Sequence, residues 1–397
     1  MSESPSSPVA RSPESFASLG LNSELVRGLE FAGIVTPTPV QLLAIPSILT
    51  GRDVRVRAET GSGKTLAYGL PLLQSIGPQP RAQGRHSNPI AALIVVPTRE
   101  LATQVGVVLS EVARGLAGAP RVVAVYGGVG LHPQLVALRS GVDVLVATPG
   151  RLLELYEKNA VDFDSLKSLV LDEADRMLSL GFSDELARLL AVLPPLRQNL
   201  LFSATFPTVL SSVTLSLLRD PIEIELAPVA GAGTDLIEQH VYTVDAKRKD
   251  ALLIHLLKER DLRQVLVFVS AKQTANVLAS KLRRAQLDVE VFHGDKSQTD
   301  REYGLAEFRS GRLHVLLATD LAARGLDVQD LPCVINYELP RSPKDYIHRI
   351  GRTGRAGKSG LALSLICPAE YHHFGVIEKR TKQRLKREQV VGFEVRG

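Results

Sequence analysis

The chain has 397 residues, of which 45% are hydrophobic, so it is long enough for two domains of about 200 residues and too apolar to be disordered throughout. Its 47 lysine and arginine residues give it a net charge of +5, a small excess that permits a polyanionic partner without establishing one. Two cysteines, Cys333 and Cys367, exclude a disulfide framework and a cysteine-rich zinc site, so we expect a reducing compartment.

The amino terminus is polar and rich in proline and serine, and it lacks the apolar core of a secretory signal. No apolar run in the sequence reaches the roughly 18 residues of a membrane-spanning helix. We therefore expect a disordered tail over residues 1–15 and a cytoplasmic protein that has no membrane partner.

Short apolar segments alternate with helical stretches from Phe16 to residue 225. These segments are rich in β-branched residues or leucine, and we expect strands at 54–58, 92–96, 122–126, 142–147, 168–171 and 199–202. Apolar runs that alternate with helices predict a parallel sheet covered on both faces. A first domain is therefore expected over residues 16–225.

Small residues without periodicity follow, and residues 226–236 are expected to form a flexible linker. The alternation then resumes over residues 237–377, with strands expected at 239–244, 265–269, 289–292, 315–318, 334–337 and 361–366. The fold class is thus α/β, with two tandem domains that each contain a parallel sheet flanked by helices.

The strongest local motif is A-E-T-G-S-G-K-T at residues 58–65, between a predicted strand and a predicted helix. It matches the phosphate-binding loop, in which backbone N–H groups at a helix N-terminus hold phosphates. Lys64 is expected to reach the β- and γ-phosphates, and the Thr65 hydroxyl to ligate Mg²⁺. The other residues expected to bind the nucleotide in this loop are Thr60, Gly61, Ser62 and Gly63.

A second motif, S-L-V-L-D-E-A-D at residues 168–175, places carboxylates directly after an apolar strand. A strand-end aspartate beside a phosphate loop is the usual second Mg²⁺ ligand, and Asp172 occupies that position. Glu173 can then orient or deprotonate the attacking water. Acidic residues after strands also act as helix N-caps, but the neighbouring phosphate loop favours the catalytic interpretation.

Residues 172–175 spell D-E-A-D, and the motifs follow the order found in the DEAD-box RNA helicases of helicase superfamily 2, which the chain resembles over residues 16–377. The resemblance implies two RecA-like domains, an ATP-binding domain over residues 16–225 and a helicase C-terminal domain over residues 237–377, in a compact core of bacterial type. It also implies ATP and Mg²⁺ as cofactors, RNA as the partner, and hydrolysis of ATP to ADP and phosphate.

Phe16, Gly33 and P-T-P-V-Q at residues 37–41 resemble the family's adenine-reading Q motif. The resemblance implies that Gln41 hydrogen-bonds the adenine edge and that Phe16 stacks on the base. An amide can pair with both a donor and an acceptor of adenine, and the sequence contains no N-K-x-D guanine motif, so ATP is favoured over GTP.

Three features depart from the family pattern. Ile34 stands where an aromatic residue is usual, and Glu59 stands where glutamine is frequent. Arg55 and Arg57 lie on one face of the strand that precedes the phosphate loop, which is unusual for a buried parallel strand. The sequence therefore does not predict how these four residues pack or the details of the adenine site, whereas the ATPase assignment does not depend on them.

Motifs at the ends of predicted strands resemble the family's contacts with the sugar–phosphate backbone of one RNA strand. These contacts are Thr98, Arg99, Gly128, Thr148, Gly150 and Arg151 in the first domain and Gln298, Arg301, Thr319 and Asp320 in the second. Taken singly, each motif is a common turn, so only their order and placement support this interpretation.

S-A-T at residues 203–205 resembles the family motif that couples ATP hydrolysis to strand separation. The resemblance assigns this role to Ser203 and Thr205, although the same residues on their own would be typical of a helix N-cap.

The second domain is expected to supply further residues to the ATPase reaction. By resemblance, Asp327 lies near the ATP ribose and His348 links the two domains through the nucleotide site. Arg352 and Arg355 resemble arginine fingers, which stabilise the negative charge that develops on the γ-phosphate during hydrolysis.

The motifs together predict RNA-stimulated ATP hydrolysis coupled to local unwinding of short RNA duplexes or to remodelling of RNA–protein complexes. An ATP-switched RNA clamp without unwinding would use the same motifs, and the Q motif and the D-E-A-D spelling weigh against a DNA helicase of the same superfamily. The specific RNA is not encoded in the motifs, and ribosomal or RNA-degradation machinery is an open class of partner.

Residues 378–397 form a basic C-terminal tail in this interpretation, with seven basic and three acidic residues. Six of the basic residues fall within residues 379–387, which suits a solvated helix end and an RNA-contacting tail about equally. If the tail contacts RNA, its deletion is expected to weaken RNA binding and to flatten the salt dependence.

Overall fold

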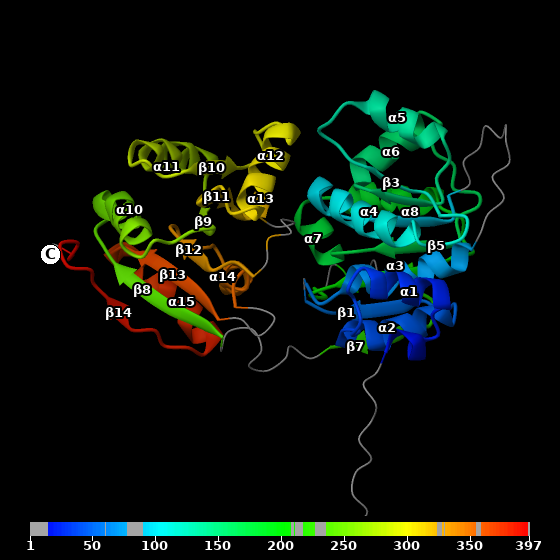
Figure 1. Cartoon of the computed structure of the whole chain (residues 1–397), viewed down its shortest axis with the longest axis horizontal. Helices are drawn as coiled ribbons and strands as arrows, with labels where there is room; N and C mark the ends of the chain where they lie inside the picture. The colour runs from blue at the N-terminus through cyan, green and yellow to red at the C-terminus, as the bar shows by residue number, and fades with distance from the viewer. Residues whose placement is uncertain are drawn as a thin grey trace, which may run out of the picture. The chain divides into compact units, whose positions relative to one another are not determined.

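The computed structural model describes residues 15–59, 61–77, 90–207, 210, 217–226, 236–323, 328, 330–354 and 359–395. The chain divides into two compact units, Met1–Pro228 and Val229–Gly397, and in its described residues each unit contains a seven-stranded parallel sheet (Figure 1). The predicted α/β fold class is therefore confirmed. The predicted tail over residues 1–15 and the predicted linker over residues 226–236 lie almost entirely outside the described residues.

The first unit contains the six strands expected from the sequence, within two residues at either end, and a seventh that was not predicted. Its strands are β1 Val54–Arg57, β2 Ala92–Val95, β3 Val122–Val125, β4 Val144–Ala147, β5 Ser168–Leu171, β6 Gln198–Ser203 and β7 Ile222–Glu225. The helices whose bounds lie within the described residues are the 3₁₀ helix η1 Phe16–Leu19 and α1 Ser23–Phe31, α2 Pro39–Leu49, α3 Lys64–Ile76, α4 Arg99–Ala113, α5 Leu131–Arg139, α6 Pro149–Glu157, α7 Ala174–Ser179 and α8 Ser183–Val192.

The sheet of the first unit has the strand order β3-β4-β2-β5-β6-β1-β7 and carries a separate core on each face. Every residue of β2, β4 and β5 is buried, as expected for apolar parallel strands that have helices on both sides. Helices α1 to α4 pack on one face and α5 to α8 on the other. Because all strands are parallel, the loops that follow them meet along one edge of the sheet, where ligands of such folds bind.

The charged residues of β1 are explained by its neighbour β7. The register of the two strands sets Arg55 beside Glu223 and Arg57 beside Glu225. The Nη1 atoms lie 2.6 Å and 3.4 Å from the respective carboxylate Oε1 atoms, and the Arg55 guanidinium also lies 4.2 Å from the centroid of the Phe206 ring. The alternating sequences V-R-V-R and I-E-I-E thus place one apolar face on the core and one ion-paired face outside.

The second unit contains the six expected strands, again within two residues at either end, and an unpredicted edge strand. Its strands are β8 Ile237–Thr243, β9 Val265–Val269, β10 Val289–Phe292, β11 Val315–Thr319, β12 Cys333–Asn336, β13 Gly360–Ile366 and β14 Arg387–Glu388, in the order β10-β11-β9-β12-β13-β8-β14. Its helices are η2 Ala246–Arg248, α10 Lys249–Glu259, α11 Lys272–Arg284, α12 Gln298–Arg309, α13 Asp320–Ala323, α14 Pro343–Ile350, η3 Pro368–Glu370 and α15 Tyr371–Thr381.

The described part of the C-terminal segment belongs to the fold of the second unit, and in this respect the predicted separate tail is wrong. Helix α15 ends at Thr381, and the chain then runs beside β8 and pairs with it as β14. Leu385, Val390 and Phe393 pack against the hydrophobic clusters of this unit. The cationic run concealed this packing in the sequence, because its charges alternate with the side chains that face inward. Among the described residues, no helix has both the length and the apolar composition of a membrane-spanning segment.

Candidate active site

The phosphate loop connects β1 to the N-terminus of α3 and depends on glycine for its shape. Gly61 and Gly63 have φ values of 83° and 95°, in the left-handed region that favours glycine. A Cβ atom on Gly63 would lie 2.7 Å from both Gln41 Nε2 and Thr38 Oγ1. The backbone of the loop therefore approaches the Q motif too closely for any larger residue.

Lys64 begins α3 and is buried, with 6% of its surface exposed. Its ammonium donates a hydrogen bond of 3.1 Å to the carbonyl of Ala58, so it closes the loop upon itself. The Ser62 hydroxyl likewise donates a hydrogen bond of 2.8 Å to the carbonyl of Glu59. Because this contact involves the backbone of Glu59, it does not depend on the side chain that departs from the family pattern. Thr65 follows in the first turn of the helix, and Thr60 lies outside the described residues.

Gln41 fastens the Q motif to the phosphate loop. Its Oε1 accepts a hydrogen bond from the Thr38 N–H at 2.9 Å, and its Nε2 donates to the Gly63 carbonyl at 3.1 Å. The proposed reading of adenine by Gln41 stays a prediction. The stacking role of Phe16 is not supported, because the ring is only 2% exposed within the hydrophobic core and offers no free face to a base.

Asp172 follows β5 and is held by two donors. The Tyr68 hydroxyl donates to Oδ2 at 3.0 Å, and the Glu173 N–H donates to Oδ1 at 2.8 Å. Burial raises the pKa of Asp172, and the charge of Lys64 opposes this rise. Sequence reasoning missed Tyr68, because its contact with Asp172 joins residues 104 positions apart.

The side chains around Asp172 fit the Mg²⁺ that the motifs imply. Mg²⁺ is usually held by one or two carboxylates together with substrate phosphates and water. The Tyr68 hydroxyl interacts with both Thr65 and Asp172, so the two predicted ligands lie close to one another beside the phosphate loop. Among the described residues, no cluster of three or more His, Cys, Asp or Glu side chains forms a metal site independent of a nucleotide.

Glu173 has a backbone φ of 51°, which is uncommon for a residue other than glycine and directs the chain from β5 into α7. Its carboxylate forms an ion pair of 2.8 Å with Arg176, and each of the two side chains is 10% exposed. The predicted catalytic carboxylate is therefore held in a fixed, nearly buried position beside Asp172.

The S-A-T motif is joined to the D-E-A-D motif through Asp175. The Asp175 N–H donates to Ser203 Oγ at 3.1 Å, and the Thr205 N–H donates to Asp175 Oδ2 at 3.1 Å. The Thr205 hydroxyl also donates to the same carboxylate, and the Ser203 hydroxyl donates to the Thr205 carbonyl at 2.7 Å. Asp175 was not singled out from the sequence, although its place in the motif was a signal.

The predicted RNA contacts of the first unit come together at the carboxyl ends of β2, β3 and β4. A Cβ atom on Gly128, which has a φ of 79°, would lie 2.3 Å from Arg99 Nη1. The Gly127 N–H donates to Thr148 Oγ1 at 3.4 Å, which joins the next pair of motifs. Thr98 caps α4 by accepting from the Leu101 N–H at 3.3 Å.

Arg151 completes this group from the first turn of α6, next to Gly150. Its Nη2 donates to the Val129 carbonyl at 2.9 Å, and its Nε lies 3.0 Å from Glu154 Oε2. Its side chain is only 8% exposed, and within the described residues its Nη1 atom has no hydrogen-bond partner. A buried guanidinium N–H without an acceptor is costly, which suits a site that binds an anionic ligand.

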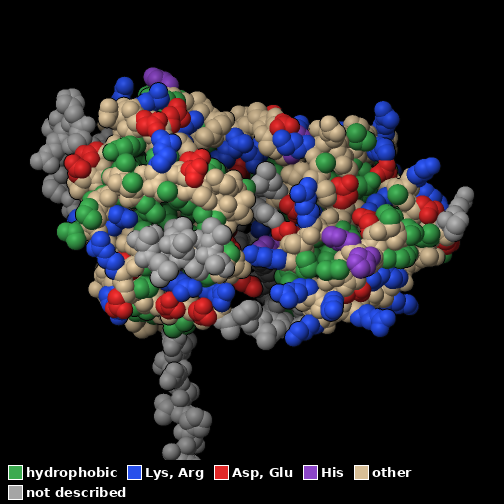
Figure 2. All heavy atoms as spheres, turned by 180° about the vertical axis from the view of Figure 1, so that it is seen from behind, with side chains coloured by type: hydrophobic (Ala, Val, Ile, Leu, Met, Phe, Trp, Pro, Cys, Tyr) green, Lys and Arg blue, Asp and Glu red, His purple; other side chains and the backbone are tan. Residues whose placement is uncertain are grey.

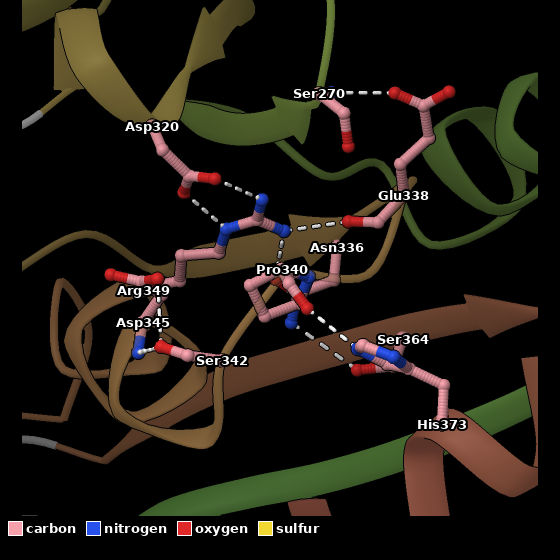
Figure 3. A network of polar contacts seen from close by, with 10 residues as sticks. All are labelled: Ser270, Asp320, Asn336, Glu338, Pro340, Ser342, Asp345, Arg349, Ser364 and His373. Carbon is pink, nitrogen blue, oxygen red and sulfur yellow. Dashed lines mark hydrogen bonds and ion pairs between the residues drawn. The ribbon is translucent and has the colours of Figure 1, made fainter.

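In the second unit, Arg349 organises a network that the sequence did not reveal (Figure 3). Arg349 is 2% exposed, and its Nε and Nη2 lie 2.6 Å and 2.7 Å from the two oxygens of Asp320. Its Nη1 donates to the Asn336 side chain at 3.1 Å and to the Glu338 carbonyl at 2.6 Å. Both carboxylate oxygens of Asp320 are thus engaged within the protein, which argues against its predicted contact with RNA.

The other residues of the second unit that were predicted to bind RNA or ATP differ in how exposed they are and in which contacts they make. Arg301 is 5% exposed and lies over the Phe292 ring, 4.5 Å from its centroid, while Gln298 Nε2 donates to Glu302 at 2.7 Å. Other predicted residues are placed as follows: Thr319 is the last residue of β11, Arg352 is buried just after α14, His348 is exposed on α14, and Asp327 and Arg355 lie outside the described residues.

Comparison with known proteins agrees with the geometry of both units. A family model described as DEAD/DEAH box helicase matches residues 38–213, and one described as helicase conserved C-terminal domain matches residues 248–357. The chain is 41% identical to the ATP-dependent RNA helicase DbpA of Escherichia coli, over 89% of this chain and 75% of that protein. It is 38% identical to the ATP-dependent RNA helicase CshA of Listeria monocytogenes, over 94% of this chain and 69% of that protein.

Longer relatives and solved structures share the same core. The chain spans 58% of the Arabidopsis thaliana DEAD-box ATP-dependent RNA helicase 30, with 41% identity. It aligns with Dbp5 of S. cerevisiae bound to RNA and ADP BeF3 over 95% of each chain, with 30% identity and a TM-score of 0.78. It also aligns with Mss116p bound to ssRNA and AMP-PNP, with 27% identity and a TM-score of 0.83 over 96% of this chain and 80% of that one.

Proposed function

The chain belongs to the DEAD-box family of ATP-dependent RNA helicases, and from this we propose that it hydrolyses ATP in an RNA-stimulated reaction. The cycle would open short RNA duplexes locally or remodel RNA–protein complexes. The observation that carries the proposal is the grouping of Lys64, Asp172 and Glu173, which are 6%, 2% and 7% exposed, around one phosphate loop.

The nucleotide would bind at the phosphate loop of the first unit. Lys64 would exchange its hydrogen bond to the Ala58 carbonyl for phosphate oxygens, while the amides at the N-terminus of α3 hold the phosphates. Thr65 and Asp172 would hold Mg²⁺, which neutralises charge on the phosphates when it is bound. The Tyr68 and Glu173 donors fix the orientation of Asp172, so this carboxylate needs no rearrangement to take up the role.

Glu173 would orient the attacking water and accept its proton. The ion pair with Arg176 fixes the direction of this carboxylate, and a general base must lie within hydrogen-bond reach of the proton that it accepts. Asp175 binds both Ser203 and Thr205, so a displacement of the D-E-A-D motif would pass directly to the S-A-T motif. This shared carboxylate supports the proposed coupling between hydrolysis and strand separation.

Residues of the second unit would complete the reaction. We assign Arg352 and Arg355 as arginine fingers, Asp327 to the ATP ribose, and His348 to the link between the units. A guanidinium at the γ-phosphate stabilises charge in the transition state and is worth several powers of ten in rate. Because the phosphate loop belongs to the first unit, hydrolysis would then require both units together.

RNA would bind through its backbone along the carboxyl ends of the strands. In the first unit, Arg99 and Arg151 supply charge and Gly128 allows a close approach of the chain, and the unpaired Nη1 of Arg151 is suited to donate a hydrogen bond to a phosphate oxygen. Thr319 at the end of β11 is the corresponding position that we retain in the second unit. The two solved relatives that bind RNA carry bound nucleotide analogues as well, which supports a joint ATP and RNA cycle.

The test of this function is Glu173→Gln, assayed for ATP hydrolysis with and without single-stranded RNA. We expect kcat to fall about 10²- to 10⁴-fold, because the group that handles the water proton is lost, while ATP binding is retained. The matched control Glu111→Gln changes an exposed carboxylate on α4 and is expected to leave the rate unchanged. Hydrolysis at the normal rate by Glu173→Gln would refute the assignment.

Two measurements separate the proposed helicase from its alternatives. ATPase stimulation by RNA but not by DNA of the same sequence is expected, since the 2′-OH distinguishes the two ligands. ATP-dependent RNA binding without separation of a short duplex would instead favour a clamp. We further propose the cytoplasm as the location, because Cys333 and Cys367 are both free thiols.

A further inference from the structure

The chain after α15 displays cations on one side and packing residues on the other. Residues 381–386 alternate between half-buried and exposed, so that Lys382, Arg384 and Lys386 all face solvent. Two further exposed cations, Lys379 and Arg380, precede them at the end of α15. We call these five residues the basic stripe.

The inward residues hold the basic stripe in place. Gln383 accepts a hydrogen bond of 2.9 Å from the Gln239 side chain, and Leu385 packs against the hydrophobic cluster beneath. Arg387 lies 2.7 Å and 2.9 Å from the two oxygens of Glu378 and begins β14, which pairs with β8. A ligand that binds to the stripe therefore meets cations whose backbone is already ordered, which lowers the entropic cost of binding.

Among the described residues, close ion pairs do not cap the basic stripe, although hydrogen bonding from Arg387 and, at longer range, the charges of Arg387 and Arg384 lower the pKa of Glu378. Within the described residues, none of the five cations lies within ion-pair distance of a carboxylate, whereas exposed cations such as Arg312 and Lys272 do. The two nearest acids in the sequence are already occupied: Glu378 binds Arg387, and Glu388 lies 2.8 Å from His240. A row of unpaired cations is favourable chiefly when an anionic partner covers it.

The basic stripe lies away from the predicted RNA contacts of the second unit. Those contacts follow β10 and β11, whereas the stripe leads into β14, five strand spacings from β11 in the sheet order. At about 4.8 Å per spacing, the two sites are about 24 Å apart. Figure 2 shows lysine and arginine side chains gathered along the lower margin of the second unit, on the side where Figure 1 draws α15 and β14.

We propose that the basic stripe is a second RNA-binding surface, which binds backbone phosphates of an RNA segment outside the strand-end contacts. The inference rests on the proposed RNA helicase function. Alternate residues of an extended chain lie about 6.6 Å apart, a spacing comparable with that of successive phosphates in an extended single strand. Lysine and arginine side chains that contact phosphates read charge and not sequence, so the surface anchors RNA of any sequence.

The test variant is Lys382→Gln, Arg384→Gln and Lys386→Gln together, compared with wild type on RNA of about 6 and about 20 nucleotides. The short RNA fills only the strand-end contacts, whereas the long RNA can also span the distance to the stripe. Loss of three phosphate contacts is expected to weaken binding of the long RNA roughly 10- to 100-fold at low salt and to reduce the slope of log K against log salt by about 2. Binding of the short RNA is expected to stay unchanged.

The matched control replaces Lys281, Arg283 and Arg284 with glutamine, which removes the same charge from the end of α11. Lys281 and Arg283 already have carboxylate partners, and α11 leads into β10 at the opposite edge of the sheet. Equal melting temperatures for all three proteins would show that each is folded. Deletion of residues 378–397 is unsuitable as a test, because it would also remove Arg387 and Phe393 from the fold.

Two outcomes overturn the inference. If the triple variant binds the long RNA with the affinity and the salt dependence of wild type, the stripe does not bind RNA. An acidic protein surface would then be the alternative partner of the stripe. An equal loss in the control would show a general effect of net charge. Either result would leave the proposed helicase intact, since RNA-stimulated hydrolysis is tested separately with Glu173→Gln.

Discussion

Asp320→Asn separates the two roles that can be given to this residue. The sequence resemblance placed Asp320 on RNA, whereas the structure places both of its carboxylate oxygens on the guanidinium of Arg349. The substitution keeps the size of the side chain and removes its charge. It therefore leaves Arg349, which is 2% exposed, with only neutral partners in the interior of the second unit.

The expected loss of stability follows from the burial of the pair. Removal of one partner of a buried ion pair costs about 3–5 kcal/mol. The Asp320 side chain is 26% exposed, so water screens part of the interaction, and asparagine still accepts one hydrogen bond from Arg349. We therefore expect the free energy of unfolding of the second unit to fall by about 2–3 kcal/mol.

Urea unfolding followed by circular dichroism measures this change, and hydrogen exchange in peptides from β12 and α14 assigns it to the second unit. The control Asp261→Asn removes an exposed partner of Arg263 and is expected to change stability by less than about 0.5 kcal/mol. Wild-type stability together with weakened RNA binding in Asp320→Asn would refute the structural role and restore the RNA contact.

Three further predictions concern the nucleotide site and the C-terminal strand. Gly63→Ala is expected to weaken ATP binding and to cost at least about 1 kcal/mol of stability, because of its φ and the close contact of its Cβ; nucleotide titration and thermal melting measure the two effects. Tyr68→Phe removes one buried hydrogen bond to Asp172 and is expected to lower kcat about tenfold and to lower the melting temperature as well; steady-state kinetics at several Mg²⁺ concentrations and thermal melting measure the two effects. Burial lowers the pKa of His240, but its hydrogen bonds to Glu238 and Glu388 outweigh this effect and raise the pKa overall. The stability that protonated His240 contributes is fully present below the ordinary histidine pKa and is lost as pH rises through the raised value. Hydrogen exchange in β14, corrected for the intrinsic pH dependence of the exchange rate, is therefore expected to be faster at pH 8 than at pH 6. His240→Gln should abolish this difference.

Local patterns in the sequence were sufficient for most of the fold. Most of the six strands predicted in each unit are apolar runs that can be recognised without knowledge of their neighbours, whereas β1 and β8 mix apolar residues with charged and polar ones. The two missed strands lie at sheet edges: β7 reads I-E-I-E, and β14 has only two residues within a cationic run. An edge strand is half solvated, so its sequence carries little of the apolar signal on which prediction depends.

In the candidate site, likewise, some residues could be found from local motifs, and others only from contacts between distant parts of the chain. The positions of Lys64, Asp172 and Glu173 follow from motifs that each lie within eight residues of sequence. By contrast, the contact of Tyr68 with Asp172 and that of Arg349 with Asp320 join residues 104 and 29 positions apart. No local pattern indicates which of several polar side chains will meet in the folded protein.

The sequence by itself thus determined the order of strands and helices along the chain, the phosphate loop and the two carboxylates that follow β5. These depend on local backbone geometry and on periodic burial, which neighbouring residues encode. Only the tertiary structure decided that Phe16 is a core residue, that Asp320 is an internal partner of Arg349, and that the basic C-terminal segment is an ordered edge of the second sheet. In each case the decision depends on which distant residue a side chain packs against, because burial removes it from water and fixes its partner.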